Sequence, residues 1–319
     1  MRAMRVHGLG EALRLDEVAP PEAGPGQLRL RVRACGLNFA DTLMVAGKYQ
    51  EKPQIPFSPG LELCGIVEAL GAGATGFAPG DRVAAYAGAG GLAEVVAVPA
   101  ERCVAVPEGM PDEQVAGFLI AYGTSDVALS HRAGLKAGET LLVTGAAGGV
   151  GLTAVELGKA LGARVIACAR GADKLEVARA AGADHLIDAS EDLRAAVKAL
   201  GGADVIYETV GGATFTACLG AARPEARILP IGFAGGEVPQ IPANILLVKN
   251  LTVHGVYWGA YAGLRPSVLT DSFARLFDLW RAGRIRPHVS HVLPLEAANE
   301  GLDLLRSRQA TGKVVVRVG

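Results

Sequence analysis

The stretch LLVTGAAGGVG, residues 141–151, predicts a buried strand that runs through a glycine turn into a helix. Its glycines are spaced G-x-x-G-x-x-G, a variant of the G-x-G-x-x-G pattern that binds dinucleotides. Gly145 permits the tight turn, Gly148 lets the backbone approach a phosphate, and Gly151 lets the helix pack closely on its strand. The sequence therefore predicts a pyrophosphate site at this turn.

The residues after the turn strengthen this interpretation, because a glycine triplet alone is a weak signal. A helix over residues 152–161 offers unpaired N–H groups and the positive end of its dipole to an anion. Gly149 and Val150, just before it, are therefore included in the predicted site. The apolar run at residues 164–169 arrives where the second strand of a βαβ unit is expected.

The residues after that second strand indicate which nicotinamide coenzyme is bound. An acidic residue about 20 positions after the glycines would bind the ribose 2′-hydroxyl of NAD, and none is found there. Arg170 ends the strand and Lys174 follows one helical turn later, and both cations favour a 2′-phosphate. The sequence therefore predicts NADPH. The alternative is that both are solvated charges beside Asp173 and Glu176.

Composition restricts the class of protein. The 319 residues suffice for two domains, and 31 Lys and Arg against 32 Asp and Glu leave a net charge of −1 without a basic stripe. Nucleic acid is therefore not expected as a partner. The N-terminus lacks the apolar core of a signal peptide, and no apolar run approaches the length of about 18 residues that a membrane span needs. We expect a soluble, cytoplasmic protein.

The cysteines are scattered along the chain and form no C-x-x-C pair. An odd number at such spacing favours reduced, buried thiols over a disulfide or zinc framework. They are Cys35, Cys64, Cys103, Cys168 and Cys218.

The pattern of strands and turns changes along the chain. Residues 1–118 contain short β-rich runs between Pro and Gly turns, which predicts a partly barrelled antiparallel domain. Residues 119–261 alternate strands with helices, which predicts an α/β fold with a doubly wound parallel sheet. Residues 262–319 contain two helical stretches and a final strand at 313–318, which we expect to return to the first domain. The six strands of the parallel sheet are expected at 141–143, 164–169, 185–187, 204–207, 227–231 and 251–256.

Five further segments, together with the glycine turn, occur in an order and spacing that is far more specific than any one of them. They are ACGLNFADTLMVAGKY (34–49), PFSPGLELCGIVEALG (56–71), GDRVAAY (80–86), LPIGFAGG (229–236) and TGKVVV (311–316). In these segments the chain resembles the medium-chain dehydrogenase/reductase superfamily, and within it the zinc-independent quinone oxidoreductases that use NADPH. The resemblance spans nearly the whole chain. It implies a GroES-like catalytic domain at 1–118 and 262–319 and a Rossmann domain at 119–261.

The same segments lack the metal ligands of zinc-dependent relatives. The resemblance places Asn38 where those relatives have a catalytic cysteine, and Leu61 where they have a histidine. An amide and an isobutyl group are not zinc ligands, and Cys35 falls at a non-ligand position. We therefore expect no metal, and interpret the lone H-x-x-H pair, His288 and His291, as a surface turn.

Without a metal to polarise the substrate oxygen, the acceptor has to be electron-poor already, such as a quinone or an α,β-unsaturated carbonyl. The resemblance implies hydride transfer from NADPH to such an acceptor. Two alternatives stay open. One is reduction of a 2-enoyl thioester or an enal by the same chemistry, and the other is a non-catalytic NADPH-binding protein.

The resemblance places Asn38, Asp41 and Tyr49 on the substrate side of the cleft. Asn38 can donate a hydrogen bond through its amide, and Tyr49 can donate a hydrogen bond or a proton, as a tyrosine at this place is regarded as doing in related enoyl reductases. Each residue has a structural alternative. Asn38 and Asp41 can form a turn or a helix cap, and Tyr49 can be an aromatic contact over the cleft.

The resemblance also implies further contacts to the coenzyme. Thr124 corresponds to a threonine beside the nicotinamide, with helix capping as the alternative. Gly232 and Phe233 follow a strand at its carboxyl end, where such sheets bind ligands, and Asn244 is expected near the coenzyme or the domain interface.

Two expectations concern charge and assembly. Asp188 stands where many relatives carry an aromatic residue over the adenosine phosphate, and its carboxylate would oppose a phosphate.

We also expect a homodimer paired along the edge strand at 251–256, because two joined sheet edges satisfy each other's backbone groups.

Overall fold

Two units make up the chain in the computed structural model, which describes residues 1–319. Unit 1 contains Met1–Ile120 and Pro287–Gly319, and unit 2 contains Ala121–Arg286. Unit 1 is therefore discontinuous in the sequence. None of the helices combines the length and the apolar character that crossing a membrane requires.

Unit 2 is built on a six-stranded sheet with the order β10-β9-β8-β11-β12-β13. All of its strand pairs are parallel, which confirms the predicted doubly wound sheet. The strand order reverses between β8 and β11, so the carboxyl ends of these two strands flank the topological switch point. The strands are β8 (Thr140–Thr144), β9 (Arg164–Ala169), β10 (His185–Asp188), β11 (Ala203–Glu208), β12 (Ala222–Pro230) and β13 (Thr252–Val253).

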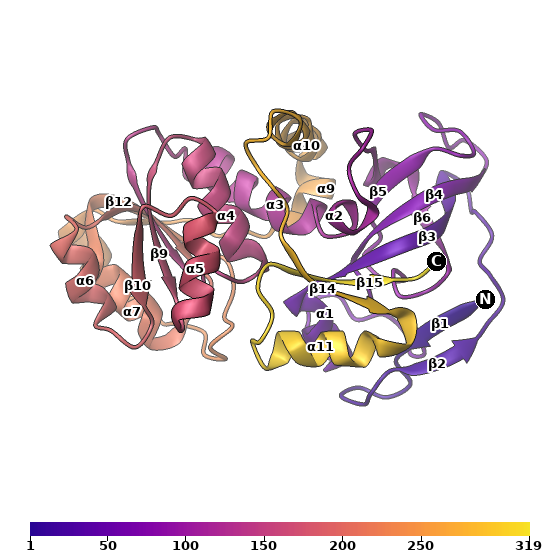
Figure 1. The fold of residues 1–319 in the computed structure, drawn as a ribbon, viewed down its shortest axis with the longest axis horizontal. Helices are drawn as coiled ribbons and strands as arrows, with labels where there is room; N and C mark the ends of the chain where they lie inside the picture. Colours follow the sequence, from indigo (N-terminus) through magenta and orange to yellow (C-terminus); the bar gives the residue numbers. More distant parts are fainter. The chain divides into compact units, whose positions relative to one another are not determined.

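Helices cover both faces of this sheet. In Figure 1, α4 and α5 lie on one side of the strands and α6 and α7 lie together on the other. Fully buried apolar side chains such as Ile206, Phe215 and Ile228 belong to one core cluster of this sheet and its helices. The helices are α3 (Leu119–Asp126), a π-helix (Val127–Arg132), α4 (Gly149–Ala160), α5 (Ala172–Ala180), α6 (Leu193–Ala199), α7 (Gly212–Ala221), α8 (Ala243–Lys249), α9 (Tyr261–Leu264) and α10 (Pro266–Arg281).

Unit 2 extends to residue 286, beyond the position 261 at which the sequence analysis ends the Rossmann domain. The difference is due to α10, whose apolar face is buried in unit 2. Phe273 of α10 packs edge-on against Trp258, with ring centroids 6.2 Å apart. Arg275 of α10 forms an ion pair of 2.5 Å with the buried Asp126. The alternation of strands and helices ends near residue 261, but these long-range contacts decide to which unit α10 belongs.

Unit 1 contains a seven-stranded sheet in which β14-β15-β3-β4-β5-β7 follow one another and β6 pairs with β3. Its pairs are antiparallel except for β14 with β15. The register of β3 against β4 shifts twice, and such irregularities bend a strand and increase its twist. The strands are β1 (Arg2–Arg5) and β2 (Arg14–Glu17), which pair separately, β3 (Gln27–Leu37), β4 (Glu62–Leu70), β5 (Arg82–Tyr86), β6 (Val95–Pro99), β7 (Cys103–Ala105), β14 (Val289–Pro294) and β15 (Lys313–Arg317).

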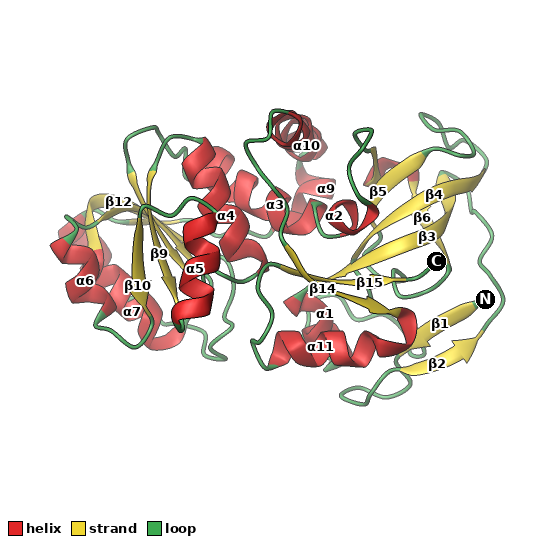
Figure 2. Cartoon of the chain, in the orientation of Figure 1, coloured by secondary structure: helices red, strands yellow, loops and turns green.

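The last strand of the chain completes this sheet. β15 pairs with β3, so that Val314 lies opposite Leu37. Figure 2 shows α1 (Phe39–Val45) and α11 (Ala298–Arg306) together below β14 and β15, and α2 (Asp112–Ala116) above β3 in this view. The expected return of the C-terminal strand is thus present in the pairing, and it brings Lys313 beside the end of β3.

A half-buried acid, Glu156, joins α4 to the last residues of unit 2. The hydroxyl of Tyr122 donates a hydrogen bond to one carboxylate oxygen of Glu156, and the other oxygen accepts the Arg286 N–H at 3.1 Å. Burial raises the pKa of Glu156 to about 7, although both donors favour the charged form. The folded state therefore binds a proton at Glu156 more tightly than the unfolded chain does.

We predict that Glu156→Gln changes the pH dependence of stability and not the fold. Because the folded pKa lies above the unfolded value of 4.5, Glu156 favours folding fully below that value, and this contribution is lost as the pH rises through about 7. The loss is about 3 kcal/mol, since each pKa unit corresponds to about 1.4 kcal/mol. Urea unfolding from about pH 5 to about pH 8 should show the wild type losing stability relative to Glu156→Gln. Parallel pH profiles of the two proteins would contradict the prediction.

Candidate functional site

The glycine turn joins β8 to α4 at the carboxyl edge of the parallel sheet. Gly145 has a φ of +59°, which glycine adopts without strain. A Cβ on Gly151 would lie 2.2 Å from the carbonyl oxygen of Gly145, so the close approach of the helix to the turn requires glycine. A Cβ on Gly148 would meet the same oxygen at 3.4 Å, which is ordinary contact. The fold itself therefore does not need glycine at position 148, and a missing side chain there keeps the helix start accessible.

The start of α4 has the properties of an anion site. α4 begins at Gly149, three residues before the predicted start, and no side chain caps it. Its first intrahelical bond runs from the Leu152 N–H to the Gly148 carbonyl at 2.8 Å, so the N–H groups of Gly149, Val150 and Gly151 precede the helical ladder. These N–H groups and the positive end of the helix dipole fit the pyrophosphate of a dinucleotide.

Glu208, at the end of β11, anchors the other side of the switch point, and the sequence analysis missed it. Its buried carboxylate accepts the N–H groups of Val210 and Gly211 and the hydroxyl of Thr144, at 2.8 to 3.1 Å. The Thr144 hydroxyl also accepts the Thr209 N–H at 3.0 Å. Burial raises the pKa of Glu208, and the three donors act against that rise. The network holds the turns after β8 and β11 together. The sequence signal for Glu208 is an acidic residue at the end of an apolar run.

The structure places Gly232 and Phe233 beside this network. They follow β12, and the next residue, Ala234, donates its N–H to the Thr209 carbonyl at 3.0 Å. The Phe233 ring comes within 3.3 Å of the position that a Cβ on Gly211 would take. Phe233 is 40% exposed, so its ring stands at the surface of this edge. The segment after β12 is therefore held against the turn that follows β11.

Thr124 and Asn244 differ in how close they lie to the glycine turn. Thr124 is buried in α3, and the hydroxyl of the next residue, Ser125, donates to the Val150 carbonyl at 3.0 Å. The segment of Thr124 is thus tied to the start of α4. Asn244 is exposed on the first turn of α8, a helix that packs on β12.

Opposite charges meet at the carboxyl ends of β9 and β10. Arg170 is exposed directly after β9, and Lys174 lies in the first turns of α5. Asp188 ends β10 and accepts the Gly171 N–H at 2.8 Å and the Ser190 hydroxyl at 2.7 Å. The Ser190 and Gly171 bonds lower the pKa of Asp188, and the charge of Arg170 lowers it further. Asp188 is therefore ionised at neutral pH, and its charge offsets part of the positive charge predicted for this edge.

Asn38 and Asp41 lie at the start of α1 and are held by buried hydrogen bonds. The Asp41 carboxylate accepts the Asn38 N–H at 2.8 Å and the Gly60 N–H at 3.0 Å. The Asn38 amide donates to the Gly36 carbonyl at 3.2 Å and to Glu62 at 3.0 Å. Both amide hydrogens of Asn38 are thereby used inside the protein. A hydrogen bond from Asn38 to a substrate would therefore need one of these bonds to break.

Lys313 and Glu62 complete this cluster, and the sequence analysis missed both. The Lys313 ammonium lies 2.9 Å from a Glu62 carboxylate oxygen, with both side chains almost fully buried. Lys313 stands in the quoted segment TGKVVV and Glu62 in PFSPGLELCGIVEALG, so charged residues inside apolar strands were the available signal.

Tyr49 follows α1 on the same stretch of chain. It is half-buried, two residues after the turn at Gly47, which has a φ of +68°. The Lys48 N–H donates to the Leu43 carbonyl at 2.8 Å and fixes this turn to α1. The three predicted catalytic residues thus lie at the two ends of one short helix of unit 1.

No group of three or more His, Cys, Asp or Glu side chains in residues 1–319 is arranged to hold a metal ion. Leu61 is a buried apolar residue, and burial raises the pKa of the Cys35 thiol well above its usual range. Cys35 is therefore a neutral thiol in a core.

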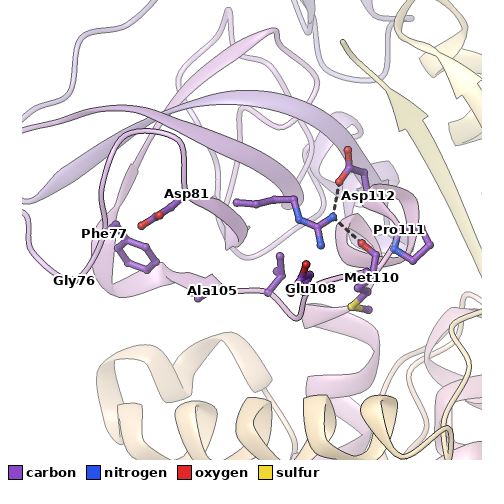
Figure 3. Close-up of a pocket in the computed structure, with 11 residues that line it drawn as sticks. Gly76, Phe77, Asp81, Ala105, Glu108, Met110, Pro111 and Asp112 are labelled. Carbon is purple, nitrogen blue, oxygen red and sulfur yellow. Dashed lines mark hydrogen bonds and ion pairs between the residues drawn. The ribbon is translucent and has the colours of Figure 1, made fainter.

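An open pocket of about 730 Å³ lies elsewhere in unit 1 (Figure 3). The Arg82 guanidinium beside it donates to the carbonyls of Pro107 and Met110 and to Asp112, at 2.6 to 2.9 Å. These bonds tie β5 to the segment before α2, which is a structural role. None of the predicted site residues lines this pocket. Its lining consists of Gly76, Phe77, Asp81, Arg82, Ala105, Val106, Glu108, Gly109, Met110, Pro111 and Asp112.

Family models match both parts of the chain. A model described as "Alcohol dehydrogenase GroES-like domain" matches residues 24–108, and one described as "Zinc-binding dehydrogenase" matches residues 149–276. The first confirms the GroES-like character expected of unit 1, and the second lies within unit 2.

Relatives and solved structures are similar over the whole chain. "Quinone oxidoreductase-like protein 2 homolog" of Nematostella vectensis is 41% identical over 99% of this chain and 88% of its own length. The quinone oxidoreductase of Escherichia coli, solved in complex with NADPH, has a TM-score of 0.94 and 29% identity, and covers 99% of this chain and 100% of its own. The quinone oxidoreductase of Thermus thermophilus, also described with its NADPH complex, has a TM-score of 0.86 and 36% identity, with 99% and 100% covered.

Two alanine substitutions in the glycine turn should separate folding from dinucleotide binding. Gly148→Ala meets only ordinary contacts, so we expect a free energy of unfolding within about 1 kcal/mol of the wild type, but an affinity for pyridine dinucleotides lower by about tenfold or more. Gly151→Ala drives a methyl group into the turn and should cost about 1 to 3 kcal/mol of stability. Urea unfolding and nicotinamide fluorescence titration measure the two effects. Unchanged affinity in Gly148→Ala would show that no phosphate approaches the turn.

Proposed function

Because this chain belongs to the quinone oxidoreductase family of the medium-chain dehydrogenase/reductase superfamily, we propose that it transfers hydride from NADPH to a quinone or a similar electron-poor carbonyl acceptor without a metal ion. The observation that carries the proposal is the uncapped start of α4 beside the switch point of the sheet. The NADPH complexes of the related enzymes support the choice of coenzyme. The cytoplasmic location stays a prediction.

Unit 2 binds the coenzyme in this proposal. The N–H groups of Gly149, Val150 and Gly151 hold the pyrophosphate, and Arg170 and Lys174 bind the 2′-phosphate. The further contacts come from Thr124, Gly145, Gly148, Gly232, Phe233 and Asn244. The bound coenzyme supplies the hydride, so the protein has to orient it and exclude water.

Unit 1 supplies the groups that act on the acceptor. Tyr49 donates a proton or a hydrogen bond to the acceptor oxygen as the hydride arrives. Asp41 and Asn38 hold the start of the helix that leads to Tyr49, through the Asp41 bonds to Asn38 and Gly60. In this arrangement Tyr49 touches the substrate, while Asn38 and Asp41 position the segment that carries it.

The proposal extends to a homodimer. β13 is an edge strand of the parallel sheet, and an edge presents unpaired backbone groups. Leu247 and Val248, at the end of the helix before β13, are 76% and 67% exposed. A second copy paired along β13 would cover both the edge and these side chains.

An acceptor screen with Tyr49→Phe tests the proposed reaction. We expect NADPH oxidation with quinones, and a fall in kcat of about tenfold or more in Tyr49→Phe, because the proton donor is lost while the ring remains. The NADPH dissociation constant should not change. Tyr261→Phe is the matched control and should keep its kcat, because the Tyr261 ring packs edge-on against His131 in unit 2.

The screen also separates the alternatives. Faster turnover of enals and enoyl thioesters than of quinones would favour the enoyl reductase, and NADPH binding without turnover of any acceptor would favour a non-catalytic protein. An unchanged kcat in Tyr49→Phe would remove this residue from the chemistry.

Coenzyme preference should respond to charge at the ends of β9 and β10. Arg170→Ala together with Lys174→Ala should lower the ratio of kcat/KM for NADPH over NADH by about tenfold, since charged hydrogen bonds to the 2′-phosphate are lost. Asp188→Asn should raise the same ratio, because the amide oxygen can still accept the Gly171 N–H while the negative charge is gone. Arg179→Ala, at the exposed end of α5, serves as the control. If none of these substitutions changes the ratio, the adenosine ribose does not bind at the ends of β9 and β10.

A further inference from the structure

Lys313 is a buried lysine, and every hydrogen of its ammonium group donates a hydrogen bond inside the protein. Its side chain is 7% exposed, and Nζ donates to the Leu37 carbonyl at 2.8 Å, to Asn38 Oδ1 at 2.8 Å and to Glu62 Oε1 at 2.9 Å. An ammonium group has three hydrogens, and each has its own acceptor here. No hydrogen remains for a substrate, so any influence of Lys313 on chemistry has to act through these three partners.

Glu62 binds this cation and further parts of unit 1. Its Oε1 also accepts the Asn38 amide at 3.0 Å, and its Oε2 accepts the Ile120 N–H at 3.0 Å. Taking both charges out of water is costly, and a well-packed apolar pair often serves stability equally well. A buried ion pair of this kind therefore calls for a reason besides stability, and its contacts with Asn38 provide one.

The ion pair fixes the Asn38 side chain in a single orientation. The cation binds its oxygen, and the carboxylate and the Gly36 carbonyl bind its two hydrogens, so a flipped amide would place like dipoles together. The Asn38 N–H is bound by Asp41, whose other oxygen holds Gly60. One ammonium thus organises the end of β3, the start of α1 and the turn before β4.

We propose that Lys313 is a positioning residue of the reaction, an internal cation that orients Asn38 and the helix leading to Tyr49. The inference rests on the proposed function. Asn38 stands where the resemblance places a zinc ligand in other members of the superfamily, and here a positive charge lies 2.8 Å from its side-chain oxygen. Lys313 thereby supplies the positive charge of this centre from the protein itself.

The neighbouring acids make the cation necessary. Burial raises the pKa of Asp41 to about 6, Lys313 lowers it, and Glu62 raises it. The other titratable group that faces this centre is the buried Cys35 thiol. Without the ammonium, Asp41 would keep the neighbouring Glu62 charge and lose the cation that lowers its pKa, so the Asp41 carboxylate would take up a proton more readily. The bonds of Asp41 to Asn38 and Gly60 would then weaken.

Lys313→Ala with added amines tests the proposal directly. We expect kcat for the quinone to fall by about tenfold or more and the acid limb of its pH profile to move to higher pH. The NADPH dissociation constant should stay within about twofold. Propylammonium, which replaces the deleted atoms, should restore a saturable part of kcat, and tetramethylammonium should not. Lys159→Ala, which removes an exposed ion-paired lysine, is the control and should show neither loss nor rescue.

A double variant covers the case in which Lys313→Ala does not fold. Lys313→Met with Glu62→Gln removes both charges and keeps an acceptor for the Ile120 N–H, so we expect a melting temperature near that of the wild type. Its kcat should nevertheless stay low, because Asn38 has lost its cation. A double variant that folds and has wild-type kcat and pH profile would overturn the proposal and leave Lys313 a structural role. If instead the wild type oxidises NADPH with none of the acceptors, the proposed function fails. The melting temperatures of the variants still show how much the ion pair contributes to stability.

Discussion

The ammonium of Lys313 is the interaction on which the organisation of unit 1 depends. It lies on the last strand of the chain and binds the end of β3, the first residue of β4 and the residue that starts α1. Through Glu62 the same cluster holds the Ile120 N–H, at the end of the first segment of unit 1. Parts of the chain that are distant in sequence therefore meet at one buried charge. Because an unpaired buried charge is costly, all of these partners have to be in place together.

Unit 2 uses the same physical solution at its switch point. Glu208 is buried at the end of β11, and its carboxylate is satisfied by two backbone N–H groups and one hydroxyl. Asp41 in unit 1 is likewise satisfied by two backbone N–H groups. In each case a buried carboxylate fixes turns that follow or precede strands. These turns are thereby held in place, since a charged acceptor binds N–H groups more strongly than a neutral one does.

Much of the fold could be predicted from local patterns. The apolar runs and the glycine turn indicated the strands of unit 2 within a few residues, because strand periodicity and turn conformation depend on neighbouring residues. The edge strand β13 is shorter than expected, and α10 belongs to unit 2, because contacts such as Phe273 with Trp258 join residues that no local pattern connects. The carboxyl ends of β9 and β10 show the same limit. Arg170 was visible as a charge, but the bond of Asp188 to Gly171 depends on the pairing of β9 with β10.

Residue types at fixed spacing were sufficient to determine the parallel sheet, the glycine turn and the lack of metal-ligand residues at positions 38 and 61. The hydrogen-bond partners of Asn38, in contrast, were decided by tertiary contacts alone. Its amide hydrogens are committed to Gly36 and Glu62, and its oxygen to Lys313, which lies 275 residues further along the chain. Spacing cannot reveal such a contact, because β15 lies beside β3 only when the sheet forms. Each charge that is then buried has to be hydrogen-bonded to a partner inside the protein.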